Sequence, residues 1–132
     1  MIPERFAPIT YALFRIVFGL VFLMFGLQKT MGLFGGQAIP IFPISRLGLA
    51  GLIETVCGFL ILIGLFARPA AFLASGEMAA AYFLAHFPQS PIPIVNMGER
   101  AAMFCFAFLY IASRGAGIWS VDSMIGRGSR KR

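Results

Sequence analysis

Residues 47–66 read LGLAGLIETVCGFLILIGLF, a stretch in which Glu54 is the only charged side chain. A helix of about 20 apolar residues is long enough to cross the ~30 Å hydrocarbon core of a bilayer. Similar apolar stretches occupy residues 9–27, 70–87 and 96–113. The sequence therefore predicts an all-α protein, in which residues 1–132 form a single integral membrane domain built as a bundle of four transmembrane helices.

The composition agrees with a membrane location. Of the 132 residues, 59% are hydrophobic and 12% are charged, whereas soluble domains contain about 25% charged residues. The net charge of +6 does not indicate nucleic-acid binding, because the basic residues lie between and after the apolar stretches, where they determine topology. We expect the lipid bilayer, and no nucleic acid, as a partner.

The segments between the apolar stretches carry turn residues. Met31–Pro43 is rich in glycine and proline, Arg68 and Pro69 follow the second stretch, and three prolines follow the third. Asn96, with Glu99 three residues later, resembles a capping box. The fourth helix is therefore predicted to begin at Asn96.

The distribution of basic residues predicts the topology. With four spans, both termini share a side with the turn at Arg68. Seven basic residues fall on that side and three on the other, so we expect both termini in the cytoplasm. The first side holds Arg5, Arg68, Arg114, Arg127, Arg130, Lys131 and Arg132, the last four in a short basic C-terminal tail, and the second holds Lys29, Arg46 and Arg100.

Several ionisable residues lie inside or at the ends of the apolar stretches. A charge in lipid costs roughly 2.5 kcal/mol or more, so such residues face the bundle interior and usually mark a functional site. Arg15, Gly19, Phe22, Gly26 and Lys29 follow a 4-3-4-3 spacing, which places them on one helix face. Small residues on that face allow close helix packing.

Depth along the helices divides the charges into two groups. Arg15 and Glu77 both lie about 10 Å from the cytoplasmic side, which predicts a structural ion pair between them. A larger group is expected near the outer side, and it comprises Gln28, Lys29, Glu54, His86, Glu99 and Arg100. Glu77 and His86 are nine residues apart and point in opposite directions on an ideal helix, unless the helix unwinds before Pro88.

Each residue of the outer group has a structural and a functional interpretation. Glu54 either pairs with Lys29 or, as an uncompensated buried carboxylate, carries a proton. Lys29 either extends to the headgroups or binds an anionic or carbonyl group. His86 either caps a helix end or exchanges protons near neutral pH. Glu99 either stabilises its helix N-terminus or joins a proton path.

Several cofactors are not expected from this chain alone. One histidine cannot supply two axial haem ligands, and Cys57 and Cys105, in separate stretches, do not fit an iron–sulfur cluster. We expect no metal site, and no phosphate-binding loop or serine-hydrolase motif occurs. Redox chemistry would need a bound quinone or a partner that carries the cofactor.

The motifs together resemble the DoxX family of small four-helix bacterial membrane proteins. They are Arg15-x-x-x-Gly19 with Gly26-x-x-Lys29, Glu54-x-x-x-Gly58 with Arg68-x-Ala70-Ala71, Ala81-Tyr82-Phe83-x-Ala85-His86, Asn96-x-Gly98-Glu99, and Gly115-x-Gly117-x-x-Ser120-x-Asp122. One departure is Ala116, where the family often has proline.

The resemblance implies a multi-pass protein of the bacterial inner membrane with a link to oxidoreductase systems. Relatives are tied to thiosulfate:quinone oxidoreductase, to quinol oxidation and to complexes that handle thiol stress. It also implies that the pattern residues are Lys29, Glu54, Arg68, His86 and Glu99.

The sequence thus leads to one main hypothesis, a quinone-linked oxidoreductase or a subunit of a membrane redox complex that uses thiosulfate or a thiol as electron donor. Glu54, His86 and Glu99 would be catalytic and pass protons, while Gln28, Lys29 and Arg100 would bind the quinone or substrate. Two alternatives stay open: a small proton-coupled transporter that acts as a dimer, and a non-catalytic scaffold subunit. We expect a homo-oligomer or a complex with other membrane subunits in each case.

Overall fold

A computed structural model describes residues 1–40 and 45–126, and within these ranges the chain is helical and contains no strand. The all-α prediction is therefore confirmed. The helices are η1 (Glu4–Phe6), α1 (Ala7–Met31), α2 (Arg46–Ile63), α3 (Ala67–Ala81), η2 (Tyr82–His86), α4 (Pro93–Asn96), α5 (Glu99–Arg114) and α6 (Val121–Met124). Residues 41–44 of the first connection and the basic residues Arg127, Arg130, Lys131 and Arg132 lie outside the described ranges.

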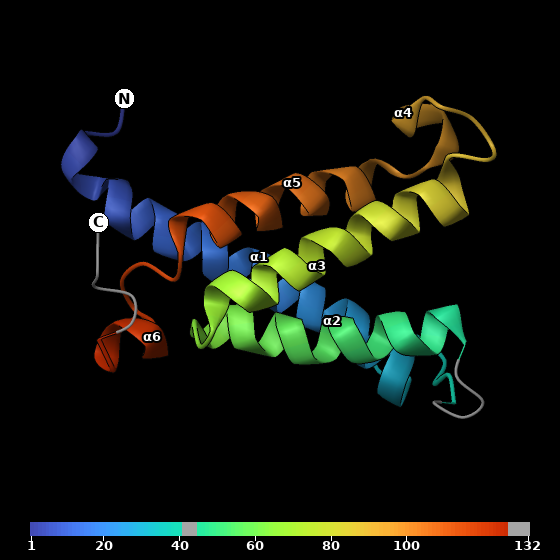
Figure 1. The fold of residues 1–132 in the computed structure, drawn as a ribbon, viewed down its shortest axis with the longest axis horizontal. Helices are drawn as coiled ribbons and strands as arrows, with labels where there is room; N and C mark the ends of the chain where they lie inside the picture. Colours follow the sequence, from blue (N-terminus) through green and yellow to red (C-terminus); the bar gives the residue numbers. More distant parts are fainter. Residues whose placement is uncertain (41–44, 127–132) are drawn as a thin grey trace.

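The long helices pack in two antiparallel pairs, α1 with α2 and α3 with α5, and α2 also packs against α3 (Figure 1). The N-terminus, the turn between α2 and α3, and the short helix α6 lie at one end of the molecule (Figure 1). The connection through α4 lies at the other end. We call these the terminal end and the α4 end.

Local sequence accounts for the ends of α1 and α2. Pro8 lies in the first turn of α1, and Gly32 ends the helix with a φ of 72°. Ser45 begins α2 by accepting a hydrogen bond from the Gly48 amide at 3.0 Å, and Gly64 ends it with a φ of 74°. These are the residue types that helix ends favour, since serine satisfies an amide and glycine adopts the left-handed conformation at low cost.

The start of α3 depends on a distant residue. Phe66, before the first residue of α3, has a φ of 50° and offers no side-chain cap. Both oxygens of Asp122 accept hydrogen bonds there instead, from the amides of Phe66 and Ala67 at 3.0 Å each. The segment after α5 is therefore attached to the α2–α3 turn.

Glycines bring α1 and α2 together. A Cβ atom at Gly19 would lie 2.6 Å from the Leu62 amide nitrogen, and one at Gly58 would lie 2.6 Å from that of Leu23. The backbones are thus in direct contact at both positions. This confirms the predicted small-residue face of α1, whose members Arg15 and Phe22 are also fully buried.

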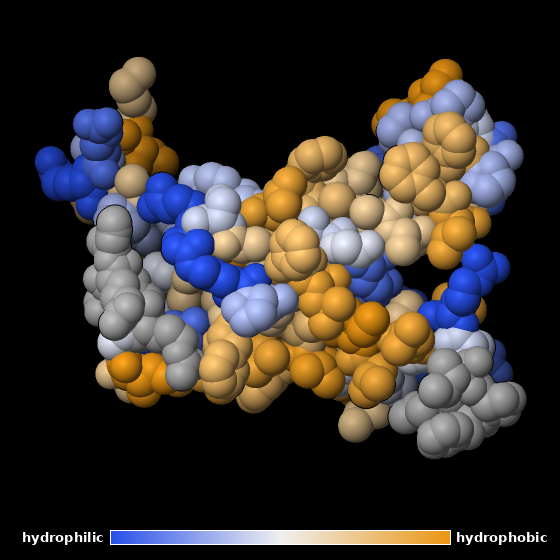
Figure 2. Space-filling view, in the orientation of Figure 1, coloured by the Kyte–Doolittle hydropathy of each residue, from blue (hydrophilic) through white to orange (hydrophobic). Residues whose placement is uncertain are grey.

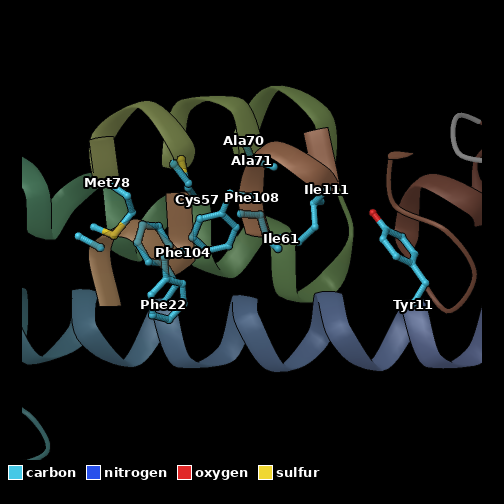
Figure 3. Close-up of a cluster of buried hydrophobic side chains, with 12 residues drawn as sticks. Tyr11, Phe22, Cys57, Ile61, Ala70, Ala71, Met78, Phe104, Phe108 and Ile111 are labelled. Atoms are coloured by element: carbon cyan, nitrogen blue, oxygen red, sulfur yellow. The ribbon is translucent and has the colours of Figure 1, made fainter. Parts of the chain in front are cut away.

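The core contains aromatic rings from α1 and α5 together with small residues of the alanine-rich helix α3 (Figure 3). The ring centroids of Phe22 and Phe108 are 4.6 Å apart, and those of Phe104 and Phe108 are 5.5 Å apart. α3 contributes small residues such as Ala70 and Ala71, which lets it lie close to its neighbours. Large apolar side chains cover much of the outer face instead (Figure 2).

Two helices are long and apolar enough by themselves to cross a membrane: α1 together with η1 (Glu4–Met31), and α2 (Arg46–Ile63). α3 and α5 have 15 and 16 residues, and η2 lengthens α3 directly. Outward-facing side chains on α3, η2 and α5, such as Phe72, Phe83 and Phe106, are nevertheless more than half exposed.

The capping box predicted at Asn96 is wrong. Asn96 ends the short helix α4, and its Oδ1 accepts a hydrogen bond from the Gly98 amide at 2.8 Å. α5 begins at Glu99, after Met97 has turned the chain with a φ of 62°. Pro93 explains the difference, because proline favours the first turn of a helix and so starts a separate one upstream.

Candidate functional site

A cavity of about 210 Å³ lies among α1, α2, α3, η2 and α5, toward the α4 end. Its polar lining gathers most of the ionisable residues singled out from the sequence. The lining residues are Phe25, Lys29, Leu47, Ala50, Glu54, Glu77, Met78, Ala81, Ala85, His86, Met97, Arg100, Ala101 and Phe104. We call it the polar cavity.

Lys29 and Glu54 form an ion pair inside this cavity. Lys29 Nζ lies 2.7 Å from Glu54 Oε1, and the side chains are 25% and 4% exposed. Gly51, one turn before Glu54, makes the pair possible, because a Cβ atom there would lie 2.9 Å from Lys29 Cβ. The lysine can therefore lie across α2 and reach the carboxylate.

Glu77 joins this pair from α3. Its Oε1 is buried and has no hydrogen-bond partner in the described part of the chain. Its charge interacts with both Glu54 and Lys29. The cavity thus brings two carboxyl groups to one lysine, and ionised carboxyl groups at this separation repel each other.

His86 reaches the same cavity because the helix changes its pitch. η2 is a π-helical turn, in which the Phe87 amide donates to the Tyr82 carbonyl, five residues earlier, at 2.8 Å. A π turn contains more residues than an α turn and so rotates the following side chains. The predicted opposition of Glu77 and His86 is removed in this way. His86 Nδ1 lies 3.1 Å from the Asn96 carbonyl oxygen.

Arg100 lines the polar cavity from α5. Its guanidinium carbon lies 4.9 Å from the centre of the Phe25 ring, and Lys29 Nζ lies 5.7 Å from the same centre. Both distances fall within the range of cation–π contacts. Phe25 therefore makes cation–π contacts with both cations that border the cavity. The sequence did not indicate this role for Phe25.

Two predicted site residues do not line the polar cavity. Gln28 turns to the connection after α1, where its Nε2 donates to the Phe34 carbonyl at 3.2 Å. Glu99 is half-buried in the first turn of α5, and its Oε1 has no hydrogen-bond partner among the described residues. The structure thus gives Glu99 a position at a helix N-terminus, where a carboxylate is favoured.

The predicted ion pair of Arg15 with Glu77 is wrong. Arg15 is fully buried, but all its hydrogen bonds go to main-chain carbonyls at the terminal end. It donates to Ile61 at 3.0 Å, Ile118 at 3.1 Å, Trp119 at 2.8 Å and Leu62 at 3.4 Å, and also to Ala116. The guanidinium is thus held by carbonyl dipoles, and the carboxylate that interacts with its charge is Asp122, not Glu77.

The position of the α3 N-terminus explains why Glu77 lies away from Arg15. α3 begins at Ala67, three residues before the predicted start of that span. Glu77 therefore lies nearer the middle of the continuous helical segment 67–86. Glu54 lies halfway along α2 (Arg46–Ile63), so the two carboxyl groups meet at mid-depth.

Arg68 serves the terminal end. Its guanidinium donates to the carbonyls of Ala112 at 3.0 Å, Ser113 at 2.6 Å and Arg114 at 3.3 Å. These carbonyls end α5, where a cation is favoured. Arg68 therefore stabilises the end of α5 and does not line the polar cavity.

The fold and the site define a class: an all-helical, membrane-associated protein with an acid–lysine–histidine cavity between its helices. The DoxX family profile matches residues 10–87 of the chain. An uncharacterized protein of Haemophilus influenzae is 37% identical over 134 residues, an alignment that covers 91% of this chain and 93% of that protein. The chain belongs to the DoxX family. No solved structure matches it.

Proposed function

We propose that the chain binds a quinone head group in the polar cavity and exchanges protons with it, as a membrane oxidoreductase or as a subunit of a redox complex. One observation carries the proposal: Lys29, Glu54, Glu77, His86 and Arg100, from four different helical segments, converge on one cavity. Such clusters of ionisable groups between membrane helices cost free energy and usually mark a functional site.

The lining of the polar cavity offers hydrogen-bond donors for the quinone carbonyls and an apolar surface for the quinone ring. Lys29 and Arg100 both carry N–H hydrogen-bond donors, and a quinone carbonyl is an acceptor. Apolar residues such as Met78, Ala81 and Phe104 line the rest of the cavity and match the ring. Lys29, Arg100 and His86 are thus the proposed carbonyl-binding groups.

Reduction of a quinone to a quinol takes two electrons and two protons. Glu54 and Glu77 lie together at the lysine, and His86 lies near the α4 end. We assign His86 to take up the two protons from the aqueous side and the two glutamates to deliver them to the quinone oxygens. The electrons would come from a reduced sulfur compound, thiosulfate or a thiol, through a partner subunit.

The proposed setting is the bacterial inner membrane, with four helical crossings and both termini in the cytoplasm. The polar cavity would then open toward the outer side, because it lies toward the α4 end. That end is the one away from the N-terminus and α6 (Figure 1). Exposed apolar side chains on α3 and α5 support crossings by these shorter helices as well.

Quinone content of the purified protein tests the proposal. We expect near-stoichiometric quinone after extraction and mass spectrometry of protein purified in mild detergent. Arg100→Gln and His86→Ala remove proposed carbonyl-binding groups and should each reduce the bound amount about tenfold, as expected when one hydrogen bond is lost. Glu54→Gln should also reduce it, because it removes the carboxylate that orients Lys29. Gln28→Ala, which changes a polar residue outside the cavity, is the matched control and should retain quinone.

Two outcomes would replace the proposal. Absence of quinone together with proton flux in liposomes that requires Glu54 would support a proton-coupled transporter. Absence of both, with normal activity of a parent complex in the Glu54→Gln and His86→Ala variants, would support a scaffold subunit.

A further inference from the structure

A second hollow lies on the outer surface at the terminal end. It is an open groove of about 510 Å³ along the C-terminal half of α5, bordered by one aromatic residue of α3. Its lining is almost entirely apolar and consists of Phe72, Phe106, Leu109, Tyr110, Ala112 and Ser113. Phe72 and Phe106 are 67% and 69% exposed, so the groove faces the surroundings of the protein and not its core. We call it the α5 groove.

Arg68 is fixed at the head of the α5 groove. The carbonyls that hold its guanidinium include those of Ala112 and Ser113, both of which line the groove. The side chain is exposed, and a guanidinium has five N–H donors, so the three carbonyl contacts leave donors for another acceptor. Because the side chain is already held in place, binding an anion through it costs little additional ordering.

Arg114 adds a second positive charge beside this position. It follows Ser113 directly, and its guanidinium carbon lies 5.0 Å from the centre of the Tyr11 ring. The Tyr11 ring in turn makes an edge contact with Tyr110 of the groove, with centroids 5.7 Å apart. Hydrophilic residues gather at this end of the molecule and border the hydrophobic surface over α3 and α5 (Figure 2).

We propose that the α5 groove binds an anionic phospholipid, with the phosphate on Arg68 and Arg114 and an acyl chain along Phe72, Phe106 and Leu109. A fixed pair of cations at the end of an apolar groove matches the charge and the shape of such a lipid. Basic pockets between membrane helices are known to bind anionic headgroups. This lipid site is separate from the polar cavity and does not depend on the quinone proposal.

Spin-labelled lipids test the site in reconstituted protein. The full chain is placed in phosphatidylcholine vesicles with spin-labelled phosphatidylglycerol or phosphatidylcholine, and the motionally restricted fraction is measured by electron paramagnetic resonance. We expect a preference for phosphatidylglycerol that Arg114→Gln lowers about fivefold, the effect expected for one basic side chain beside anionic lipid. The Arg114 guanidinium contacts the Tyr11 ring and makes no hydrogen bond to residues 1–40 or 45–126, so this variant should fold normally.

Matched variants separate a site from general attraction. Arg5→Gln removes a charge from the same end without touching the groove lining and should leave the preference unchanged. The double change Arg68→Gln with Arg114→Gln should abolish it, and inorganic phosphate at constant ionic strength should not displace the lipid. Three results would each overturn the proposal. They are the absence of a lipid preference in the unchanged protein, an equal loss of preference in Arg5→Gln, and displacement of the lipid by phosphate.

Discussion

At the scale of single residues, the Lys29–Glu54 pair is the most consequential contact of the polar cavity. Lys29→Met would leave a carboxylate that is only 4% exposed without its cation. Breaking one partner of a buried pair costs several kcal/mol. We expect a loss of about 3 kcal/mol, at the lower end of the range since Lys29 is partly exposed. Unfolding in mixed detergent micelles measures it.

A double change provides the control for this pair. Lys29→Met combined with Glu54→Gln removes the unpaired charge, so the double variant should be more stable than the sum of the two single losses predicts. Strict additivity would mean that the two side chains do not stabilise each other.

At the scale of elements, the π turn η2 depends on close packing against the start of α5. A Cβ atom at Gly98 would lie 2.8 Å from Tyr82 Cδ1 and 2.9 Å from His86 Cβ. Gly98→Ala should therefore displace η2, weaken the His86 contact to Asn96 and lower quinone content about tenfold, if the cavity binds quinone. Extraction and mass spectrometry provide the measurement.

Gly76 offers a matched control on the same helical segment. A Cβ atom there meets nothing within 4 Å, so Gly76→Ala should preserve quinone content and raise stability by up to about 1 kcal/mol, the helix propensity gained. Equal quinone loss in both variants would show that η2 packing does not position the site.

At the scale of the whole molecule, Arg15 joins α1, the end of α2 and the segment after α5. Arg15→Lys keeps the charge but replaces a planar fork of donors with a single ammonium group. We expect a loss of about 2–4 kcal/mol, since several charged hydrogen bonds are removed. Hydrogen exchange of residues 115–122 should become much faster.

Arg46→Lys makes the same substitution at an exposed position at the start of α2. It should change neither stability nor exchange in residues 115–122. Slow exchange in Arg15→Lys would indicate that Tyr11 and Asp122, which hold Gly115 and the α2–α3 turn, are sufficient to retain this segment.

The apolar stretches by themselves determined that the chain is helical, and the spacing of Arg15, Gly19, Phe22 and Gly26 identified the buried face of α1. The sequence also placed Lys29, Glu54, His86 and Arg100 in one group, because charges avoid lipid and must share the interior. The same group included Gln28 and Glu99, which do not line the polar cavity. These inferences need only composition and helical periodicity.

Only the tertiary structure decided which charges meet. Arg15 bonds to carbonyls because the loop after α5 folds over its guanidinium. Glu77 lies beside Glu54 because α3 begins at Ala67, which places Glu77 at the depth of Glu54. His86 enters the cavity through a π turn, which no α-helical periodicity predicts. Helix phase and relative depth depend on how the segments pack, and packing is a property of the assembled bundle.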